Sequence, residues 1–347
     1  MGDVDLARLN AYYGTSLAPG DFSTQRVSLP WGLRHTAKLS ALKGRFLQRY
    51  VQRVAAGFDV LINGYGAMDF GRPVVQIVAD FSFVDEWRLE LHPTFRTRRA
   101  WFYGDTRVRR AYLAICNRIS VANPEAWKRN VTLANSAWTA DRLRKLGIDS
   151  QVVYPPVIVD IPQSPANPRD AGFVCLGRVS AEKCVHSVIE ILRRVRGLGH
   201  NVHLHVLGGM DKSDYARKIR ALAEQFRDWV VLEGWTFGDR KRDLLAGHRF
   251  GINACQSEAF GVAVAEMVLA GCVVFVPNGG GQVEIANDPA LIFSSEDDAV
   301  EKITAVLASD AEEERLRAHL QRTAKAFSVE NFMESMRKVV REFLGNS

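Results

Sequence analysis

The chain has 347 residues, a formal net charge of +6 and 47% hydrophobic residues, which is an ordinary composition for a globular protein. No apolar run approaches the roughly 18 residues of a membrane-spanning helix, and no signal-peptide pattern opens the chain. The five cysteines are scattered without a C-x-x-C pair, which favours reduced thiols in a cytosolic protein. Of these, Cys175, Cys255 and Cys272 lie in or beside apolar runs and are predicted to be core residues.

Length and charge both divide the chain. Single hydrophobic cores usually stop growing at about 250–300 residues, so two domains are expected. Residues 1–157 hold 22 Lys and Arg against 13 Asp and Glu, whereas residues 158–347 hold 23 against 26. The basic surplus therefore belongs to the first half.

Two basic stretches stand out in this first half. Residues 33–56 read as an amphipathic helix that either rests on an anionic membrane surface or covers the sheet of an α/β domain. Residues 94–112 interleave arginines with aromatic side chains, which suits nucleic acid, lipid headgroups or an acidic acceptor. Nucleic acid ranks lowest, because no RNP, zinc-finger or helix-turn-helix pattern accompanies the run.

Short apolar runs in the first half predict buried parallel strands at 59–64, 73–79 and 131–134. A helix follows the third run, with Asn135 or Ser136 as its N-cap and Gly147 as its end. The proline-rich segment 155–168 is the natural linker between two domains.

Strands and helices alternate regularly after this linker. Strands are predicted at 172–177, 202–207, 229–232, 250–254 and 272–276, with helices at 180–198, 215–226, 240–247 and 261–270 between them. The chain then finishes in helices. This alternation predicts a doubly wound parallel sheet, whose ligands bind at the carboxyl ends of the strands.

The stretch Glu258 to Glu266 places one carboxylate before a small-residue helix and a second carboxylate about two turns into it, with Gly271 as the residue that ends the helix. Two acceptor groups beside a helix N-terminus suit the hydroxyls of a polyol. The alternative is that both are ordinary charges, one complementing the helix dipole and the other at the surface.

Two cations follow the strand at 172–177. Arg178 and Lys183 lie around the start of the next helix, where a lysine opposes the helix dipole. Together with free backbone N–H groups they can hold a diphosphate, although a solvated helix start explains the same residues.

These motifs occur together in a known order. The series Gly177-Arg178 to Lys183, Gly234, Glu258-Ala-Phe-Gly261, Glu266 and Gly279-Gly-Gly-Gln-Val-Glu284 resembles the donor site of the retaining GT-B glycosyltransferases of family 4. Asn135 to Thr139 and Val153 to Val157 are similar to the end of the first domain of that family. The resemblance runs from about Val131 to the C-terminus.

The resemblance implies a role for each motif. Arg178 and Lys183 would hold the nucleotide diphosphate, Glu258 the hydroxyls of the donor sugar, and Glu266 the ribose. The backbone of Phe260 and Gly261 would lie near the sugar or phosphate, and the chain around Gly234 would edge the base. Such enzymes use no cofactor and no bound metal, because the cations and the helix dipole neutralise the leaving diphosphate.

Two features depart from the family pattern. The family opens with a strand, a glycine-rich loop and a helix, and the sequence from Gly2 shows nothing of the kind, so about 30 residues or more look to be missing. Many members carry a histidine after a strand of the first domain, near the reacting carbon. Asp80 stands near that place here and is expected to touch the donor sugar or the acceptor hydroxyl.

The resemblance therefore predicts two Rossmann-like domains of α/β class. These are an incomplete acceptor-side domain at 1–157, joined by the terminal helix 330–347, and a nucleotide-sugar-binding domain at 158–329. The predicted activity is metal-independent transfer of a sugar from a nucleotide-diphosphate sugar to a hydroxyl with retained configuration, in cell-envelope glycan synthesis. The predicted acceptor is a hydroxyl of a glycan, of a lipid-linked molecule or of another compound. The predicted location is cytoplasmic, and the alternative is a peripheral position at the anionic inner face of the membrane.

Other functions remain as alternatives. A truncated or degenerate GT-B protein would bind nucleotide-sugar without efficient transfer. A dinucleotide oxidoreductase is disfavoured, because Gly279-Gly-Gly281 is not G-x-G-x-x-G. A nucleotide-sugar epimerase has a similar two-domain build, but the spacing of Glu258 and Glu266 favours transfer.

Overall fold

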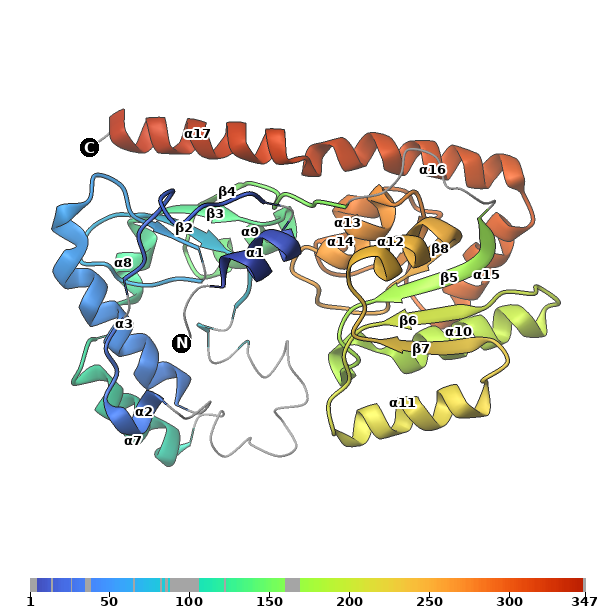
Figure 1. The fold of residues 1–347 in the computed structure, drawn as a ribbon, viewed down its shortest axis with the longest axis horizontal. Helices are drawn as coiled ribbons and strands as arrows, with labels where there is room; N and C mark the ends of the chain where they lie inside the picture. Colours follow the sequence, from blue (N-terminus) through green and yellow to red (C-terminus); the bar gives the residue numbers. More distant parts are fainter. Residues whose placement is uncertain are drawn as a thin grey trace.

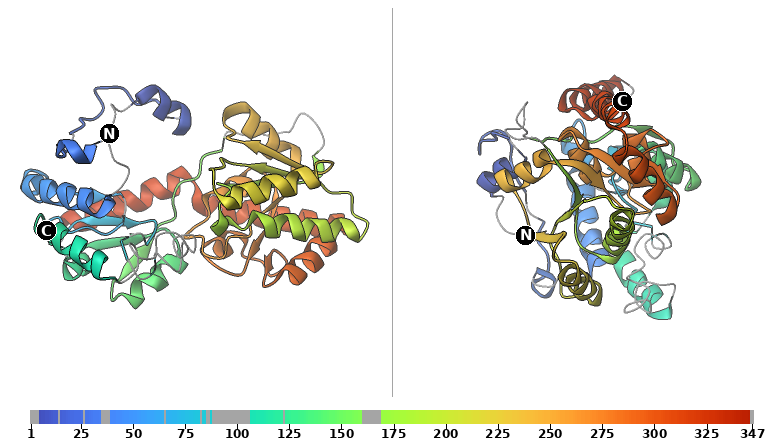
Figure 2. Two further views of the ribbon diagram at one scale, coloured as in Figure 1. Left: turned by 90° about the horizontal axis from the view of Figure 1, so that it is seen from below. Right: turned by 90° about the vertical axis from the view of Figure 1, so that its right-hand side faces the viewer.

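The computed structural model describes residues 5–13, 15–25, 27–34, 39–64, 66–81, 83–84, 87, 106–121, 123–159 and 169–345. They form two parallel α/β domains, each with its own sheet, which lie at opposite ends of an elongated molecule (Figures 1 and 2). The N-terminal domain holds a four-stranded sheet and the C-terminal domain a six-stranded one.

The C-terminal sheet has the strand order β10-β9-β8-β5-β6-β7, and every neighbouring pair is parallel. Its strands are β5 (Asp170–Leu176), β6 (Leu204–Leu207), β7 (Val230–Gly234), β8 (His248–Ile252), β9 (Val273–Pro277) and β10 (Ile292–Phe293). The chain builds outward from β5 to β7 and then returns to the other side of β5. This reversal creates a crevice at the carboxyl ends of β5 and β8, where doubly wound sheets bind their ligands.

The helices of the C-terminal domain follow its strands in turn: η2 (Ala181–Lys183), α10 (Val185–Gly197), α11 (Asp214–Gln225), α12 (Gly238–Gly247), α13 (Val262–Leu269), α14 (Gln282–Ala286), α15 (Glu296–Leu307), α16 (Asp310–Ala324) and η3 (Lys325–Phe327). Helix α13 ends at Gly271 as predicted. Gly271 has a φ of 86°, and the next amide, of Cys272, bonds back to the carbonyl of Met267. This is a Schellman cap, which needs a residue in the left-handed region.

The N-terminal sheet has the order β1-β2-β3-β4 and is also parallel, with β1 (Ile62–Asn63), β2 (Val75–Val78), β3 (Val131–Ala134) and β4 (Ser150–Val152). The other described elements of this half are α1 (Leu6–Tyr13), α2 (Trp31–Arg34), α3 (Ser40–Val54), η1 (Ala55–Gly57), α7 (Arg107–Asn117), α8 (Pro124–Lys128) and α9 (Ala137–Lys145). The hydroxyl of Ser136 caps α9, and Gly147 follows its end with a φ of 70°. Both ends of this helix were predicted.

The last helix, α17 (Val329–Gly345), leaves the C-terminal domain and lies along the N-terminal sheet (Figure 1). Val339 and Phe343 of α17 are buried against Val75 of β2 and Leu133 of β3. The C-terminal end of the chain therefore supplies part of the core of the N-terminal domain.

Two sequence expectations need correction. The helix predicted at 33–56 is not continuous over its described part, because α2 ends at Arg34, Leu39 adopts a left-handed φ of 63° and α3 begins at Ser40. The helix predicted to start at 180 starts at Val185, because Cys184 is also left-handed with a φ of 50°. Within the basic aromatic run 94–112, Arg109 is buried in α7 with its guanidinium over the ring of Tyr112.

Two further predictions fall partly on residues that the structure does not describe. Residues 94–105 of the basic aromatic run and residues 160–168 of the linker lie outside the described part. Cys175, Cys255 and Cys272 are buried free thiols, as expected. Among the described residues, no helix is long and apolar enough to cross a membrane.

Candidate functional site

An ion pair joins the two loops at the crevice of the C-terminal sheet. Lys183 lies beyond the carboxyl end of β5 and Glu258 beyond that of β8, and the Lys183 ammonium donates to Oε2 of Glu258. Both side chains are partly buried but keep some exposure to solvent. The structure therefore places a cation and a carboxylate at the position where the topology predicts a ligand.

The backbone after β5 explains how Lys183 reaches this crevice. Ala181 to Lys183 form a 3-10 turn, and the left-handed Cys184 separates this turn from α10. Burial acts to lower the pKa of Lys183, but the Glu258 carboxylate and other nearby groups outweigh it, so the pKa lies above its usual value. Lys183 is thus a fixed positive charge at neutral pH.

Arg178 does not join this pair. Its side chain is 66% exposed and lies 3.6 Å from the carboxylate of Glu182. Of the two cations predicted to hold a diphosphate, Lys183 is fixed by its ion pair, whereas Arg178 is an exposed side chain on the same loop. An exposed arginine can turn toward an anion at little cost, since surface ion pairs of this kind contribute little.

Glu266 has a lysine partner that the sequence did not indicate. It lies on α13, and its Oε1 accepts from Nζ of Lys241 on α12 at 2.8 Å. A carboxylate in this apolar helix needs such a partner, because Val264, Ala265, Met267 and Val268 around it are buried. The two residues are far apart in the sequence, so only the packing of α12 beside α13 reveals the pair.

Phe260 and Gly261 set the start of α13. The ring of Phe260 is buried, so only its backbone can face a ligand. Gly261 has a φ of 104°, and a Cβ there would lie 3.1 Å from Cβ of Gln282 and 3.5 Å from Cγ of Glu258. Glycine at this position therefore lets the loop that carries Glu258 turn tightly into the helix.

The glycine loop 279–281 packs against the backbone of Glu258. The amide of Gly281 donates to the carbonyl of Glu258 at 2.8 Å. A Cβ at Gly280 would come within 2.3 Å of that same carbonyl oxygen. The three glycines thus serve close packing of two loops, which agrees with their place in the predicted donor-site pattern.

The N-terminal domain meets this site at the start of α9. The hydroxyl of Ser136 donates to the carbonyl of Ala259, next to Glu258, at 2.5 Å. Glu284 of the C-terminal domain accepts from the amides of Ala137 and Trp138 at 2.9 and 3.0 Å. A carboxylate at a helix N-terminus satisfies free N–H groups and complements the dipole, so Glu284 couples the two domains.

Tyr154 completes this junction. Its hydroxyl donates to Glu284 at 3.0 Å, and its ring packs against Phe260 and Phe327. Burial, together with the Glu284 carboxylate, raises the pKa of Tyr154 to about 12. The roles of Glu284 and Tyr154 were not predicted, although both residues lie in motifs that the sequence singled out.

Asp80 lies on the other side of the junction. It is half-buried and follows β2 at the carboxyl edge of the N-terminal sheet. The side chain of Asn135, next to the Ser136 that meets Ala259, donates to the carbonyl of Ala79 at 3.2 Å. Asp80 therefore lies one residue from the network that joins the two domains.

Gly234 ends β7 at the same carboxyl edge as Lys183. It has a φ of 69°, and its carbonyl accepts from Gly208 at 2.8 Å. Two exposed aromatic rings follow it, since Trp235 is 70% exposed and stacks on Phe237 with 5.8 Å between ring centroids. A Cβ at Gly209 would clash with the Trp235 indole, so glycine there makes room for the ring.

The structure brings together some of the predicted site residues and leaves others apart. Lys183, Glu258 and Gly261 meet in one place, while Arg178 lies on the same loop but points to Glu182. Glu266 is held on α13 by Lys241, and Asp80 follows β2 at the carboxyl edge of the N-terminal sheet. A cation, carboxylates and exposed aromatic rings at one sheet edge suit a phosphorylated, hydroxyl-rich ligand with a planar base.

Comparisons with known proteins find similarity to glycosyltransferases. Residues 159–326 match the profile of the family described as Glycosyl transferases group 1. Curated relatives include the GDP-Man:Man(3)GlcNAc(2)-PP-Dol alpha-1,2-mannosyltransferases of Mus musculus and Homo sapiens, which are 24% and 25% identical over 58% and 59% of this chain. Each match covers 46% of the relative, so the chain spans about half the length of the curated relatives it matches.

Solved structures share the fold. Anabaena HepE in complex with UDP and glucose is similar over 85% of this chain and 81% of its own, with a TM-score of 0.62 and 14% identity. WaaG, a glycosyltransferase involved in lipopolysaccharide biosynthesis, is similar over 90% and 84%, with a TM-score of 0.59 and 18% identity. Sucrose-phosphate synthase from Thermosynechococcus elongatus is similar over 88% and 79%, with a TM-score of 0.64 and 14% identity. At these identities the likeness establishes the GT-B arrangement of two Rossmann-like domains.

Proposed function

Because residues 159–326 match the profile of the glycosyl transferases group 1 family and the chain has a GT-B fold, we propose that it transfers a sugar from a nucleotide-diphosphate donor to an acceptor hydroxyl with retention of configuration. The observation that carries this proposal is the Lys183–Glu258 pair at the strand-order reversal of the C-terminal sheet. It puts a phosphate-binding charge beside a hydroxyl-binding one, which is what a sugar diphosphate requires.

Each part of the donor has a candidate partner. The ammonium of Lys183, with the exposed charge of Arg178, matches the negative charges of the diphosphate. Glu258 accepts hydrogen bonds from sugar hydroxyls, and Glu266 does so from the ribose. Trp235 and Phe237, which follow Gly234, offer a face on which the base stacks.

The proposed transfer retains the configuration of the sugar. The bond between the anomeric carbon and the diphosphate oxygen breaks, and the acceptor oxygen bonds to that carbon from the same face. The acceptor proton passes to the departing phosphate oxygen. Lys183 stabilises the charge that develops on the leaving group, a kind of interaction worth about 10²–10³ in rate when one donor is removed. No metal is part of this proposal.

The comparisons suggest which substrates to test first. The curated relatives are named for a GDP-mannose donor and a lipid-linked glycan acceptor, so GDP-mannose is our first candidate donor. The basic surplus of residues 1–157 suits an anionic or lipid-linked acceptor presented at a membrane face. Peripheral association is tested by sedimentation with vesicles that contain or lack anionic lipid.

The central experiment measures donor binding and transfer in the same variants. Calorimetry with GDP, UDP and ADP should give one site, and Lys183→Ala should weaken the preferred nucleotide diphosphate by about 1.5–3 kcal/mol, the cost of a hydrogen bond to a charged group. Transfer from the matching nucleotide sugar should fall by about 10²–10³. Glu266→Ala should weaken nucleoside diphosphate binding but not binding of inorganic pyrophosphate.

A matched control is Lys302→Ala, which removes a partly buried lysine paired with Asp298 on α15, on another element of the same domain. It should leave both binding and transfer unchanged. Equal nucleotide affinity in wild type and Lys183→Ala would overturn the proposed site. Tight binding without transfer to any acceptor hydroxyl would instead support the alternative, a GT-B protein that only binds nucleotide-sugar.

A further inference from the structure

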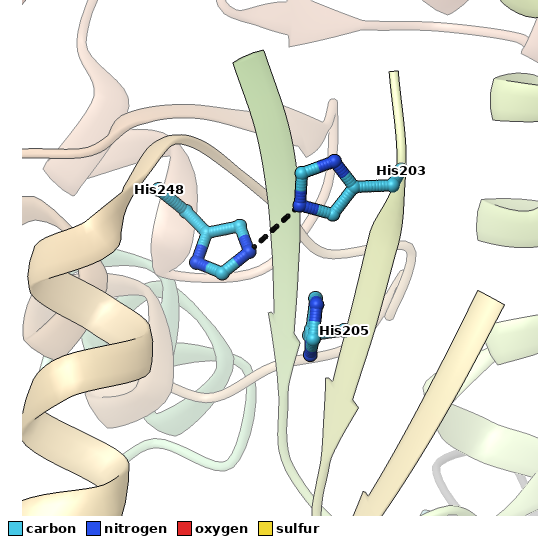
Figure 3. Close-up of side chains that lie close together, drawn as sticks. All are labelled: His203, His205 and His248. Carbon is cyan, nitrogen blue, oxygen red and sulfur yellow. Dashed lines mark hydrogen bonds between the residues drawn. The ribbon is translucent and has the colours of Figure 1, made fainter. Parts of the chain in front are cut away.

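Three histidines gather at the opposite end of the C-terminal sheet, away from the donor site. His203 immediately precedes β6, His205 lies within β6, and His248 is the first residue of β8. One ring nitrogen from each lies within 4.8 Å of the others. Figure 3 shows the three rings together over the strand that separates β6 from β8. We propose that His203, His205 and His248 form a binding site for a transition-metal ion, with zinc the best-suited ion.

The sheet is built to let these rings meet. Strand β5 lies between β6 and β8, and a side chain on it would separate the rings. Gly172 of β5 stands at this point, where a Cβ would come within 2.3 Å of Nε2 of His203 and 2.6 Å of Cδ2 of His248. His203 and His205 are two residues apart along an extended chain, so their side chains lie on the same face. Because β5 has a glycine at this point, the histidines of the neighbouring strands β6 and β8 can approach one another above it.

Two of the rings are held in the orientation that metal ligands need. Nδ1 of His248 lies 2.6 Å from the carbonyl of Leu244, and Nδ1 of His205 lies 2.7 Å from Oε1 of Glu233. Both partners only accept hydrogen bonds, so each Nδ1 carries the proton and each Nε2 keeps its lone pair. Metal-binding histidines usually donate their second N–H to a carbonyl or carboxylate in this way. Glu233 is itself fixed by Arg240 at 2.8 Å.

The third ring needs only a change of tautomer. Nε2 of His203 lies 3.1 Å from Nε2 of His248, so it donates the proton of the hydrogen bond drawn in Figure 3. With the proton on Nδ1 instead, Nε2 of His203 offers a third lone pair. In a tetrahedral zinc site the ligand nitrogens are about 3.3 Å apart, as follows from a Zn–N distance of about 2.0–2.1 Å. The three nitrogens, which lie within 4.8 Å of one another, would have to draw together to reach this spacing around an ion.

The surroundings suit imidazole ligation by a borderline ion. His248 is buried and His203 and His205 are half-buried, so the cluster keeps a path to solvent. Three imidazole nitrogens favour zinc over magnesium or calcium, which prefer oxygen. Bound metal would tie β6 to β8 across β5 without touching the donor edge.

The test uses the full chain without an affinity tag, stripped by a chelator and titrated with Zn²⁺ alone by calorimetry. We expect one ion per chain in wild type and in His200→Gln, a control histidine just before β6 that is not in the cluster. His203→Gln and His205→Gln should each weaken binding at least 100-fold. Glu233→Gln should weaken it about 10–100-fold, because the orienting carboxylate is changed while all three ligands remain.

Wild type provides a second, mutation-free measurement. X-ray absorption of the zinc-loaded protein should show three imidazole nitrogens at about 2.0 Å. The proposal is overturned if zinc does not bind, if His205→Gln binds it as tightly as wild type, or if the bound ion shows no imidazole scattering. Any of these results would mean that the three rings form only a hydrogen-bonded packing cluster.

Discussion

The two domains are held together in different ways. The C-terminal domain has one continuous core that includes residues from all its larger helices and its sheet. The described residues of the N-terminal domain form two small clusters, and one of them depends on Val339 and Phe343 from the far end of the chain. The half that carries the Lys183–Glu258 pair can therefore form on its own contacts, whereas the facing half is complete only when α17 docks.

The largest expected effect comes from weakening that docking. Phe343 is 8% exposed on α17, and Phe343→Ala should destabilise the N-terminal domain by about 3–5 kcal/mol, as expected for deletion of a core aromatic ring. Denaturation followed by calorimetry should then separate into two transitions. Nucleotide diphosphate affinity should survive, because its proposed site lies in the other domain.

The neighbouring residue supplies the control. Leu344 is 49% exposed, so Leu344→Ala should change stability by no more than about 0.5 kcal/mol. If Phe343→Ala instead lowered a single transition for the whole chain and abolished nucleotide binding, the C-terminal domain would also depend on the docking of α17.

The next largest effect concerns the link between the domains. Glu284→Ala removes the acceptor of two α9 amides and of the Tyr154 hydroxyl, and should reduce the coupling between the domains by about 2–3 kcal/mol. The expected readout is a lower stability of the N-terminal domain with the C-terminal transition in place. Glu301→Ala, at an exposed position of α15, should show neither change. Loss of the C-terminal transition as well would show that Glu284 serves the core of its own domain.

A smaller effect tests the backbone of the donor site. Gly261→Ala should cost about 1–3 kcal/mol, because alanine is strained at a φ of 104° and its Cβ meets Gln282 and Glu258. Displacement of Glu258 should weaken donor sugar binding more than binding of the nucleotide diphosphate alone. Gly247→Ala is the matched change, since nothing lies within 4 Å of a Cβ there and its φ is not positive. Equal effects of both changes would remove Gly261 from the site.

Much of the C-terminal half could be predicted from the sequence. Buried parallel strands read as continuous apolar runs, and Gly271 marked the end of α13 because only glycine takes its φ without cost. The resemblance to the GT-B family implied that Lys183 and Glu258 share one donor site. The structure joins them by an ion pair.

The parts that escaped prediction depend on packing or on unusual backbone. No local signal marks the left-handed Cys184, so the predicted helix started too early and Lys183 was placed in its first turn. The Lys241 partner of Glu266 and the α9 amides of Glu284 come from segments far away in the chain. The histidine cluster had a signal, the alternation of His203 and His205, but its third member follows only from the strand order.

The smallest predicted effect concerns Tyr154, and it tests whether the domain junction is polar as well as apolar. Tyr154→Phe keeps the ring contacts with Phe260 and Phe327 but removes the hydrogen bond to Glu284, so it should cost about 1 kcal/mol at pH 7. The folded state raises the pKa of Tyr154 from 10.0 to about 12, which means that it favours the protonated phenol. This contribution is fully present below pH 10 and is lost as the pH rises through 12. The stability advantage of wild type over Tyr154→Phe should therefore shrink between pH 10 and 12, because other titrating groups affect both proteins alike. A difference that stayed constant over that range would mean that the hydroxyl does not donate to Glu284, and that the other contacts of the junction, among them the Ser136–Ala259 bond and the bonds of Glu284 to the α9 amides, hold the two domains together without it.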